Sequence, residues 1–546
     1  MKNYFQRTHF LLLLVLLLAG FLRFYQLGTN PPSLDWDEAS LGYNAYSILK
    51  TGRDEFGNFL PLSIRSFEDY KPAVYTYLTV PSVALFGLTE FAVRLPSAIL
   101  GTLTILIVYL VLSELVKLHP NFFLSQKYKN RLPLLVAFIV AVSPWHLQFS
   151  RVAFESNIAV FFVLGGIYFF LKGRTNVKWW FHTALFFVFS FYSYHSPRLV
   201  VPLLLFGWAI YYRKYLWEKR GYVILSVIFG LILLIPFIKE FTYQGKARFS
   251  SVTVVTPQGT LDESIKRIEF DQSRGDIVGK FFHNRRIVYG QKIAQGYLDH
   301  FNIDFLFLKG DAPDRHHARD MGMLYIWEFP FILIGLGYFV SKRAYPLLWW
   351  YLVAPVASAL TTGTPHAVRA LLLIPTYQIF TGVGILWVIE KIKNKKSINL
   401  VFLSTGLVIF LTTFFYYLQM YYVHTPIEAS RDWQYGYKEA IAEIDNYPDV
   451  DKIIMTYKYD QPHVFVLFYN KVDPAWYQAQ WKGGEIQRSL RSFGKYEFRS
   501  IDWVKDANLT NTLFVGAPDE IPDDALGLVR EISFLNGKIA FRIVKR

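Results

Sequence analysis

The sequence contains no cysteine among its 546 residues. Disulfide bonds and metal sites built on thiolates are therefore excluded. Charged residues are scarce at 18%, whereas hydrophobic residues make up 53% of the chain. Apolar runs recur along most of the sequence, which is typical of a protein that crosses a membrane many times. The absence of cysteine and of eukaryotic domain signatures favours the plasma membrane of a prokaryote.

The formal net charge of +15 comes largely from short loops between the apolar runs. Lys and Arg gather at 117–131, 172–178, 213–220, 342–343 and 391–396. Such loops are cytoplasmic in membrane proteins. Outside them we find no basic stripe with interleaved aromatic residues, so a nucleic-acid partner is not expected.

The run 72–88 decides the predicted topology. It is short, contains Pro72 and Pro81, and is polar at Thr76, Thr79 and Ser82. If it crossed the membrane, every later basic loop would lie outside, so we expect a juxtamembrane helix at the outer surface. The N-terminus is then cytoplasmic, and the first apolar run is a retained span. Counted with this first span, we expect about eleven spans. They are the runs 9–26, 93–115, 132–149, 156–171, 179–194, 199–212, 221–239, 323–341, 346–361, 370–390 and 398–422.

We expect two parts in the chain. Residues 1–423 form a transmembrane catalytic module, with a first outer loop at 28–92 and a long outer loop at 240–322. Residues 424–546 have a mixed composition and predict a small extracytoplasmic α/β domain. In that domain "DKIIMTYKYD" and "TLFVGAP" resemble buried strands, and "WQYGYKEAIAEI" resembles a helix. "EISFLNGKIAFRIVKR" predicts a hairpin that turns at Asn536-Gly537.

Carboxylates cluster in the first outer loop. Asp35, Asp37 and Glu38 lie within four positions of one another, just after the first span. A carboxylate can take a proton from a hydroxyl group or bind a divalent ion. The stretch "DEASLGYNAYSIL" also fits an ordinary helix start, where acidic side chains are favourable.

Cations share this outer surface with the acids. Asp69 and Lys71 precede the juxtamembrane helix, and Arg94 begins the next span. Arg and Lys suit phosphate groups, and a phosphate at membrane level suggests a lipid phosphate. A base, a phosphate site and a lipid together predict group transfer from a lipid-phosphate donor to an acceptor hydroxyl, with positive charge meeting the leaving phosphate. The alternatives are a snorkelling Lys71 and an interface-anchoring Arg94.

Three stretches of this loop resemble the GT-C membrane glycosyltransferases: "DWDEASLGYNAYSILKTGRDEFGNFLP", "DYKPAVYTYL" and "FGLTEFAVRLPSAILG". The similarity is closest to the branch that holds protein O-mannosyltransferases and bacterial aminoarabinose-lipid A transferases. "SPWHLQFSRVAFESN" and "YSYHSPRLVVPLL" are similar to later segments of bacterial members. The resemblance covers most of residues 1–380 and implies a GT-C-like fold.

The resemblance also implies roles for the acids. The acid pair of the family's first loop matches Asp37 and Glu38, with Asp37 the expected base toward the acceptor. The family's second acid matches Glu155 in "RVAFESN", beside Arg151. These matches imply a catalytic set of Asp37, Glu38 and Glu155.

The lysine that meets the donor phosphate in aminoarabinose transferases matches Lys71, and an arginine at the start of the next span matches Arg94. In those transferases a Glu before the lysine contributes to a metal site. Tyr70 stands at that position here, which puts a bound metal in doubt. No cofactor is required by the sequence, and a divalent ion (Mg, Mn or Zn) stays open.

Later outer segments add further candidates. His195 and Arg198 in "YHSPR" either contact the donor phosphate or cap the next helix. In "GTPHAVRA", Arg369 is a second candidate for the phosphate and His366 a candidate for acceptor or sugar contact. Trp433 could stack on a sugar, although a domain-docking tryptophan is more common.

The segment "DAPDRHHARDMG" (311–322) holds Asp311, Arg315, His316 and His317. Adjacent histidines rarely bind one metal ion together. We therefore expect a flexible loop on the acceptor side rather than a metal site.

The function that combines these features is an inverting glycosyltransferase on the outer face of the plasma membrane. Its partners would be a polyprenyl-phosphate sugar, membrane lipid and an acceptor glycan, lipid or protein. Lys71, Arg94, Arg198 and Arg369 would bind the donor phosphate. The expected acceptor or sugar contacts are Asp35, Asp69, Arg151, His195 and His366.

Two other classes remain open at this point. A transporter or flippase of lipid-linked substrates would need charges within spans and paired broken helices, and only Glu328 in "LYIWEFPFILIGL" fits that pattern. A non-catalytic assembly subunit would differ from the enzyme only in keeping its function when the acids are removed.

Overall fold

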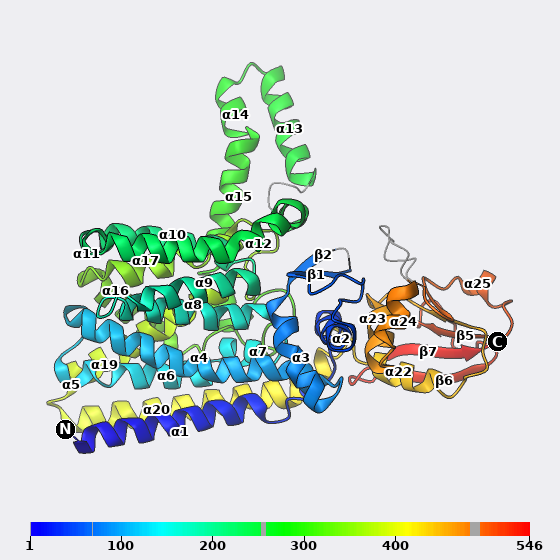
Figure 1. The fold of residues 1–546 in the computed structure, drawn as a ribbon, viewed down its shortest axis with the longest axis horizontal. Helices are drawn as coiled ribbons and strands as arrows, with labels where there is room; N and C mark the ends of the chain where they lie inside the picture. Colours follow the sequence, from blue (N-terminus) through cyan, green and yellow to red (C-terminus); the bar gives the residue numbers. More distant parts are fainter. Residues whose placement is uncertain (1, 68, 253–257, 481–491) are drawn as a thin grey trace.

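The computed structural model describes residues 2–67, 69–252, 258–480 and 492–546. Long helices lie side by side in a bundle (Figure 1). The N-terminus and the short helices α5 (Gln126–Lys129) and α11 (Arg213–Glu218) lie at one end of this bundle. The C-terminal domain lies at the opposite end, next to α2 (Trp36–Thr51).

Six helices are long and apolar enough to cross a membrane, or up to seven if one bent pair counts as a span. They belong to α1 (Lys2–Phe24), α4 (Glu90–Leu118), α8 (Glu155–Lys172), α12 (Arg220–Val252), α19 (Thr376–Ile392) and α20 (Lys396–Gln419). The bent pair is α6 (Leu132–Val142) and α7 (Pro144–Ser150), at 61°. The predicted polytopic helical fold is confirmed, whereas the count of about eleven spans stays a prediction.

Shorter helices fill the remainder of the bundle. They are α9 (Trp179–Ser193), α10 (Pro197–Tyr211), α16 (Glu328–Ser341), α17 (Tyr345–Val353) and α18 (Val356–Ala359). Glu328, the residue that favoured a transporter, is fully buried at the first turn of α16. It accepts hydrogen bonds from the backbone N–H of Tyr325 (3.2 Å) and from the hydroxyl of Thr381 (3.0 Å). Both oxygens of its carboxylate are thus hydrogen-bonded within the protein.

The first outer loop folds into compact structure. After α2 come the antiparallel strands β1 (Ser63–Ser66) and β2 (Asp69–Pro72), and then α3 (Val74–Phe86). Helix α3 has 13 residues and crosses the direction of α4, as Figure 1 shows. This geometry agrees with the juxtamembrane helix predicted for 72–88.

The long outer loop predicted at 240–322 is largely helical. A helical arm projects away from the bundle in Figure 1, formed by α13 (Gln258–Ser273), α14 (Ile277–Phe282) and α15 (Arg285–Asp299). A short π-helical turn, Asp304–Leu308, follows the arm and leads into the segment 309–327.

The C-terminal part contains a five-stranded sheet with the order β4-β3-β5-β7-β6. Its strands are β3 (Lys452–Met455), β4 (Tyr496–Phe498), β5 (Thr512–Gly516), β6 (Leu528–Ser533) and β7 (Ile539–Lys545). Its helices are α22 (Tyr437–Ile444), α23 (Pro462–Tyr469), α24 (Pro474–Gln480) and α25 (Trp503–Asp506). Gly537 has φ +82°, the left-handed conformation that a tight hairpin turn requires. The predicted strands, helix and hairpin are confirmed.

One hydrophobic core joins α2 and α3 to the C-terminal domain. It contains Tyr43 and Val93 from the membrane module and Phe465 and Phe468 from α23. A Cβ atom at Gly42 would lie 2.6 Å from both Phe468 and Val93, so only glycine allows this close approach. The domain therefore forms part of the support of α2, the helix that carries the acid cluster.

Candidate active site

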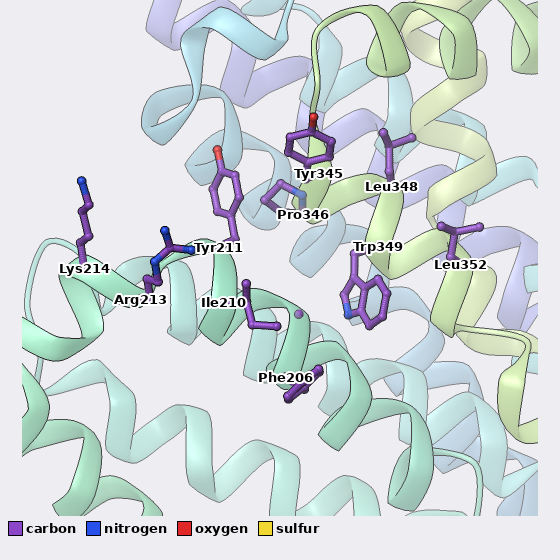
Figure 2. Close-up of a pocket in the computed structure, with 11 residues that line it drawn as sticks. Phe206, Ile210, Tyr211, Arg213, Lys214, Tyr345, Pro346, Leu348, Trp349 and Leu352 are labelled. Carbon is purple, nitrogen blue, oxygen red and sulfur yellow. The ribbon is translucent and has the colours of Figure 1, made fainter.

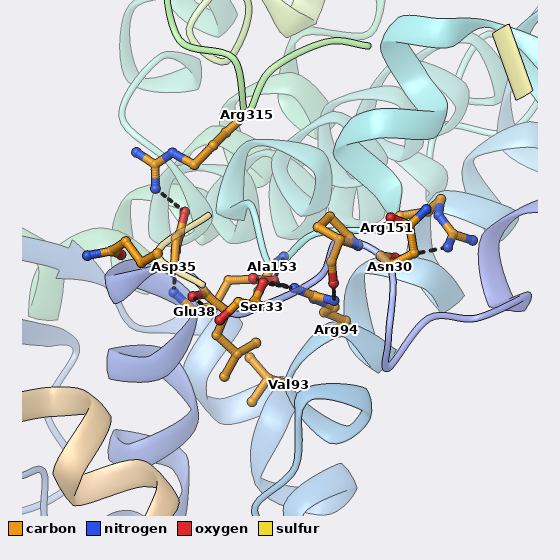
Figure 3. Close-up of polar contacts among 12 residues, drawn as sticks. Asn30, Ser33, Asp35, Glu38, Val93, Arg94, Arg151, Ala153 and Arg315 are labelled. Carbon is orange, nitrogen blue, oxygen red and sulfur yellow. Dashed lines mark hydrogen bonds and ion pairs between the residues drawn. The ribbon is translucent and has the colours of Figure 1, made fainter. Parts of the chain in front are cut away.

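Glu38 and Arg94 form a buried ion pair between the start of α2 and the start of α4 (Figure 3). Nε and Nη2 of Arg94 donate to the two oxygens of Glu38 at 3.0 and 2.9 Å. The remaining donors of Arg94 go to the carbonyls of Leu27, Pro31 and Ser33. All five guanidinium N–H groups are thus used within the protein. This saturation assigns Arg94 to the scaffold and speaks against the predicted contact with a donor phosphate.

Glu38 also fixes the segment that leads to Glu155. The backbone N–H of Ala153 donates to Oε1 of Glu38 at 3.0 Å. Glu155 begins α8 two residues later. Because Glu38 is 1% exposed and accepts three hydrogen bonds, it suits a positioning role better than the catalytic role predicted for it. It links Asp37, its neighbour in sequence, to Glu155.

Asp35 is the N-cap of α2, and its side chain accepts from the backbone N–H of Glu38 at 2.8 Å. Its other oxygen pairs with Arg315, whose guanidinium lies 4.6 Å from the ring centre of Trp36. Burial raises the pKa of Asp35 to about 6; Arg315 opposes this shift, and Asp37 and Glu38 add to it. The predicted sugar contact has no support in this geometry, because the carboxylate is 1% exposed.

Arg151 is a second buried scaffold cation. Its guanidinium donates to the carbonyls of Leu22, Arg23 and Asn30 and to the hydroxyl of Tyr421. The side chain joins the end of α1 to the turn Met420–His424 that follows α20. This role differs from the predicted contact with acceptor or sugar.

Asp37 has a different environment. Its side chain is 41% exposed, and one oxygen pairs with Lys71, which is 12% exposed. Glu155 interacts electrostatically with both Lys71 and Asp37. The backbone N–H of Trp36 donates to the side chain of Gln434 at 2.8 Å, which fixes the start of α2. An accessible carboxylate, a cation and a second carboxylate therefore meet here.

Arg369 extends this cluster from a segment far away in the sequence. Its Nη1 donates to Thr361 and to the carbonyl of Thr362, and its guanidinium also interacts with Tyr194. Tyr194 in turn interacts electrostatically with Glu155 and Asp37, so it lies near both Arg369 and the acids. Tyr194 was missed by sequence reasoning, because a tyrosine next to an apolar run has no distinguishing pattern.

His195 and Arg198 lie next to each other at the start of α10. Nη1 of Arg198 lies 2.6 Å from Nδ1 of His195, and its Nε donates to the carbonyl of Phe191 near the end of α9. Arg198 therefore bonds to the end of α9, the preceding helix, and does not cap the next helix as one alternative predicted. Its contact with a donor phosphate stays a prediction. Burial, together with Arg198 and Arg369, lowers the pKa of His195 to about 3, which keeps the imidazole neutral. The side chain of Asp69, another predicted contact, lies outside the described residues.

Asp311, His316 and His366 converge beside Arg369. Nδ1 of His316 lies 2.7 Å from Oδ2 of Asp311, and Nδ1 of His366 lies 4.0 Å from the same oxygen. The backbone N–H of Ala367 also donates to this oxygen, at 2.8 Å. Burial would raise the pKa of Asp311, but His316 and the other donors outweigh it and lower the pKa. Within the described residues, this is the group whose donor atoms could hold a metal ion.

Trp433 is fully buried against Val152 and Ala429. The docking role is thus confirmed over sugar stacking. A groove of about 650 Å³ between α10 and α17 lies at the other end of the bundle. Figure 2 shows its apolar lining, with Arg213 and Lys214 at one end. It shares no residue with the Asp37 cluster, so it is not the candidate active site.

Comparison with known proteins identifies the fold that this chain resembles. Residues 70–239 match the family described as dolichyl-phosphate-mannose-protein mannosyltransferase, over about a third of the chain. The structure of ArnT from Cupriavidus metallidurans, bound to undecaprenyl phosphate, aligns with a TM-score of 0.53 at 12% identity, covering 97% of each chain. The chain has the fold of a GT-C membrane glycosyltransferase. The resemblance seen in the sequence is confirmed at the level of the fold, and the family match supports the predicted enzyme class.

A second similar structure is the archaeal oligosaccharyltransferase AglB from Archaeoglobus fulgidus, in complex with an inhibitory peptide and a dolichol-phosphate. It aligns with a TM-score of 0.49 at 13% identity, over 86% of this chain. The present chain spans 64% of the length of AglB. No protein with a curated description matches the sequence.

Proposed function

We propose that this GT-C chain is an inverting glycosyltransferase that transfers a sugar from a polyprenyl-phosphate donor to an acceptor hydroxyl on the outer face of the plasma membrane. The acceptor would be a cell-envelope glycan, a lipid or a protein. The observation that carries the proposal is the contact between accessible Asp37 and Lys71, with Glu155 and Arg369 in the same cluster.

Asp37 is the proposed general base. It takes the proton of the acceptor hydroxyl while the acceptor oxygen attacks the anomeric carbon. The bond between this carbon and the phosphate oxygen breaks, and the polyprenyl phosphate leaves as an anion. A single displacement inverts the anomeric configuration, and the proton passes from Asp37 to solvent. Glu155 would orient the sugar or the acceptor.

Lys71 and Arg369 are the proposed phosphate ligands. Their positive charge would stabilise the leaving phosphate, and neither side chain is locked into a saturated network as Arg94 is. Without donor, Lys71 pairs with Asp37. A donor phosphate would draw Lys71 away and leave the Asp37 carboxylate ready to accept a proton.

The fold supports the proposed orientation. The basic segments around α5 and α11 lie at the end of the bundle with the N-terminus, and the acid cluster lies at the opposite end (Figure 1). Basic loops are cytoplasmic, which would place the cluster and residues 424–546 outside. A lipid-phosphate donor is consistent with ArnT, which was solved with undecaprenyl phosphate.

The decisive experiment is glycosyl transfer in membranes from a radiolabelled polyprenyl-phosphate sugar, comparing wild type with Asp37→Asn at matched expression. We expect the substitution to lower transfer by about 10²–10⁴-fold, because it removes the general base. Glu428→Gln is a matched control, since Glu428 is an outer carboxylate with 43% exposure that pairs with His424.

Transfer by Asp37→Asn at the wild-type rate would contradict the general-base assignment, and Glu155→Gln would be tested next. If the wild type transfers no label from any polyprenyl-phosphate sugar, the donor class is wrong. The transporter and assembly hypotheses would then gain weight.

A further inference from the structure

Two segments distant in sequence bring metal-ligating side chains together. Asp311 and His316 lie in the segment after the helical arm, and His366 lies fifty residues further on, three residues before Arg369. One donor atom from each residue falls within 4.8 Å of the other two. The imidazole rings of His316 and His366 face each other with centroids 5.3 Å apart.

The hydrogen bonding of this group is incomplete. Oδ1 of Asp311 and Nδ1 of His366 are both buried without a hydrogen-bond partner. The Asp311 side chain has no exposed surface, so its second oxygen cannot be satisfied by bulk water. An unsatisfied buried carboxylate oxygen is costly, and a cation held between Asp311 and the imidazoles would remove this cost.

The neighbouring histidine is engaged elsewhere. Nε2 of His317 lies 2.9 Å from the carbonyl of Asp311, and its Nδ1 lies 3.0 Å from the carbonyl of Ala318. Gly310, at φ +76°, packs its backbone against the His317 ring. The adjacent histidines therefore point to different partners, and the objection that they cannot share one ion does not apply to His316 with His366.

We propose that Asp311, His316 and His366 form a binding site for a divalent transition-metal ion of the zinc class. Two imidazole nitrogens and one carboxylate are a common ligand set for such ions, whereas Mg²⁺ prefers oxygen ligands throughout. Three protein ligands leave a further coordination position for water or a ligand. The site does not depend on the identity of the sugar donor or the acceptor.

The ion has a structural consequence at the active site. It cross-links the segment 311–319 to the segment that carries Arg369. Arg315 lies within the first segment and pairs with Asp35 at the start of α2. A bound ion therefore ties the segment of Arg315, which contacts Asp35, to the segment of Arg369.

Metal binding to untagged, chelator-stripped protein in detergent tests the proposal without any sugar substrate. We expect one Zn²⁺ per chain by competition with a chromophoric chelator, and visible absorption bands when Co²⁺ replaces Zn²⁺. His366→Gln should weaken Zn²⁺ binding by more than about tenfold. His317→Gln is the matched control and should bind like wild type. Excess Mg²⁺ should not displace the ion.

Absence of Zn²⁺ uptake by the wild type would overturn the proposal, as would equal losses in the two histidine variants. If His366→Gln does not fold, Asp311→Asn and the Co²⁺ spectrum of the wild type decide. Trypsin gives a second readout, because Arg315 and Arg319 are cleavage sites within the cross-linked segment. Zn²⁺ should slow cleavage at both sites in wild type and in His317→Gln, and equal rates with and without Zn²⁺ would contradict the cross-link.

Discussion

Two neighbouring carboxylates at the start of α2 have opposite surroundings. Glu38 is 1% exposed and is held by Arg94 and the backbone of Ala153. Asp37 is 41% exposed and pairs with Lys71, which can reach another anion by moving its flexible side chain. Three hydrogen bonds hold the carboxylate of Glu38 in place, whereas the carboxylate of Asp37 is accessible to solvent.

Under the proposed function, Glu38 stabilises the fold around the site and its neighbour Asp37 takes part in the reaction. A buried, fully bonded ion pair cannot accept a proton or a phosphate without breaking its own network. It can hold α2, α4 and the start of α8 at fixed distances. The accessible pair can exchange partners, which a general base and a phosphate ligand both require.

Breaking the buried pair should have the largest effect on stability. Arg94→Leu leaves Glu38 buried without a cation, and we expect a loss of about 3–5 kcal/mol in the free energy of unfolding. Thermal unfolding in detergent measures it. Lys71→Met, at the accessible pair, should change stability by less than about 1 kcal/mol.

The double variant Glu38→Leu/Arg94→Leu should recover part of that loss, because no unpaired charge then stays buried. A stable Arg94→Leu protein with weakened donor binding would restore the phosphate contact predicted from the sequence.

A third carboxylate of this cluster, the buried Asp35, predicts that the stability of the protein depends on pH. The folded state raises the pKa of Asp35 to about 6 from 3.8, so the folded protein keeps a proton that the unfolded chain has released. The contribution of Asp35 to stability is therefore present at low pH and is lost as pH rises through about 4 to 6. Asp35→Asn, which keeps a capping oxygen, should gain on the order of 1–3 kcal/mol relative to wild type across this window.

Unfolding temperatures of both proteins between about pH 4 and 8 give the comparison. Parallel curves would show that Arg315 fully offsets the burial of Asp35. If Asp35→Asn unfolds at a lower temperature than wild type as pH rises, the carboxylate of Asp35 is stabilised in its charged form.

Substitutions of the proposed phosphate ligands should weaken binding of the donor. Lys71→Ala or Arg369→Ala removes a charge-assisted contact, and we expect KM for the polyprenyl-phosphate sugar to rise by about 10–100-fold with little change in unfolding temperature. Initial-rate kinetics measure it. Arg213→Ala, in the groove at the opposite end of the bundle, is the control. Equal KM values for Arg369→Ala and wild type would leave Lys71 as the sole proposed phosphate ligand.

Much of the fold followed from the sequence. Hydropathy placed the helices, and the run 72–88 forms the short helix α3. That this helix does not span the membrane stays a prediction. The Asn536-Gly537 turn predicted the hairpin of β6 and β7. These features depend on local pattern, which sequence carries directly.

The sequence did not show which residues near Asp37 are structural and which are accessible. Arg94 and Lys71 look equivalent as isolated cations near an acid cluster, and only the three carbonyls around Arg94 distinguish them. His366 joins Asp311 only in the folded chain, because the pattern of residues 311–322 contains no sign of a third ligand fifty positions away. Tertiary contacts of this kind leave no local signature.

The core shared by α2 and α23 has a consequence for biosynthesis. The acid cluster is made at the beginning of translation, but its supporting residues, among them Gln434 and Phe468, are made at the end. A ribosome must therefore complete nearly the whole chain before α2 reaches its final position. Under the proposed function, truncated products would insert into the membrane without the support of α2, and we expect them to transfer no sugar.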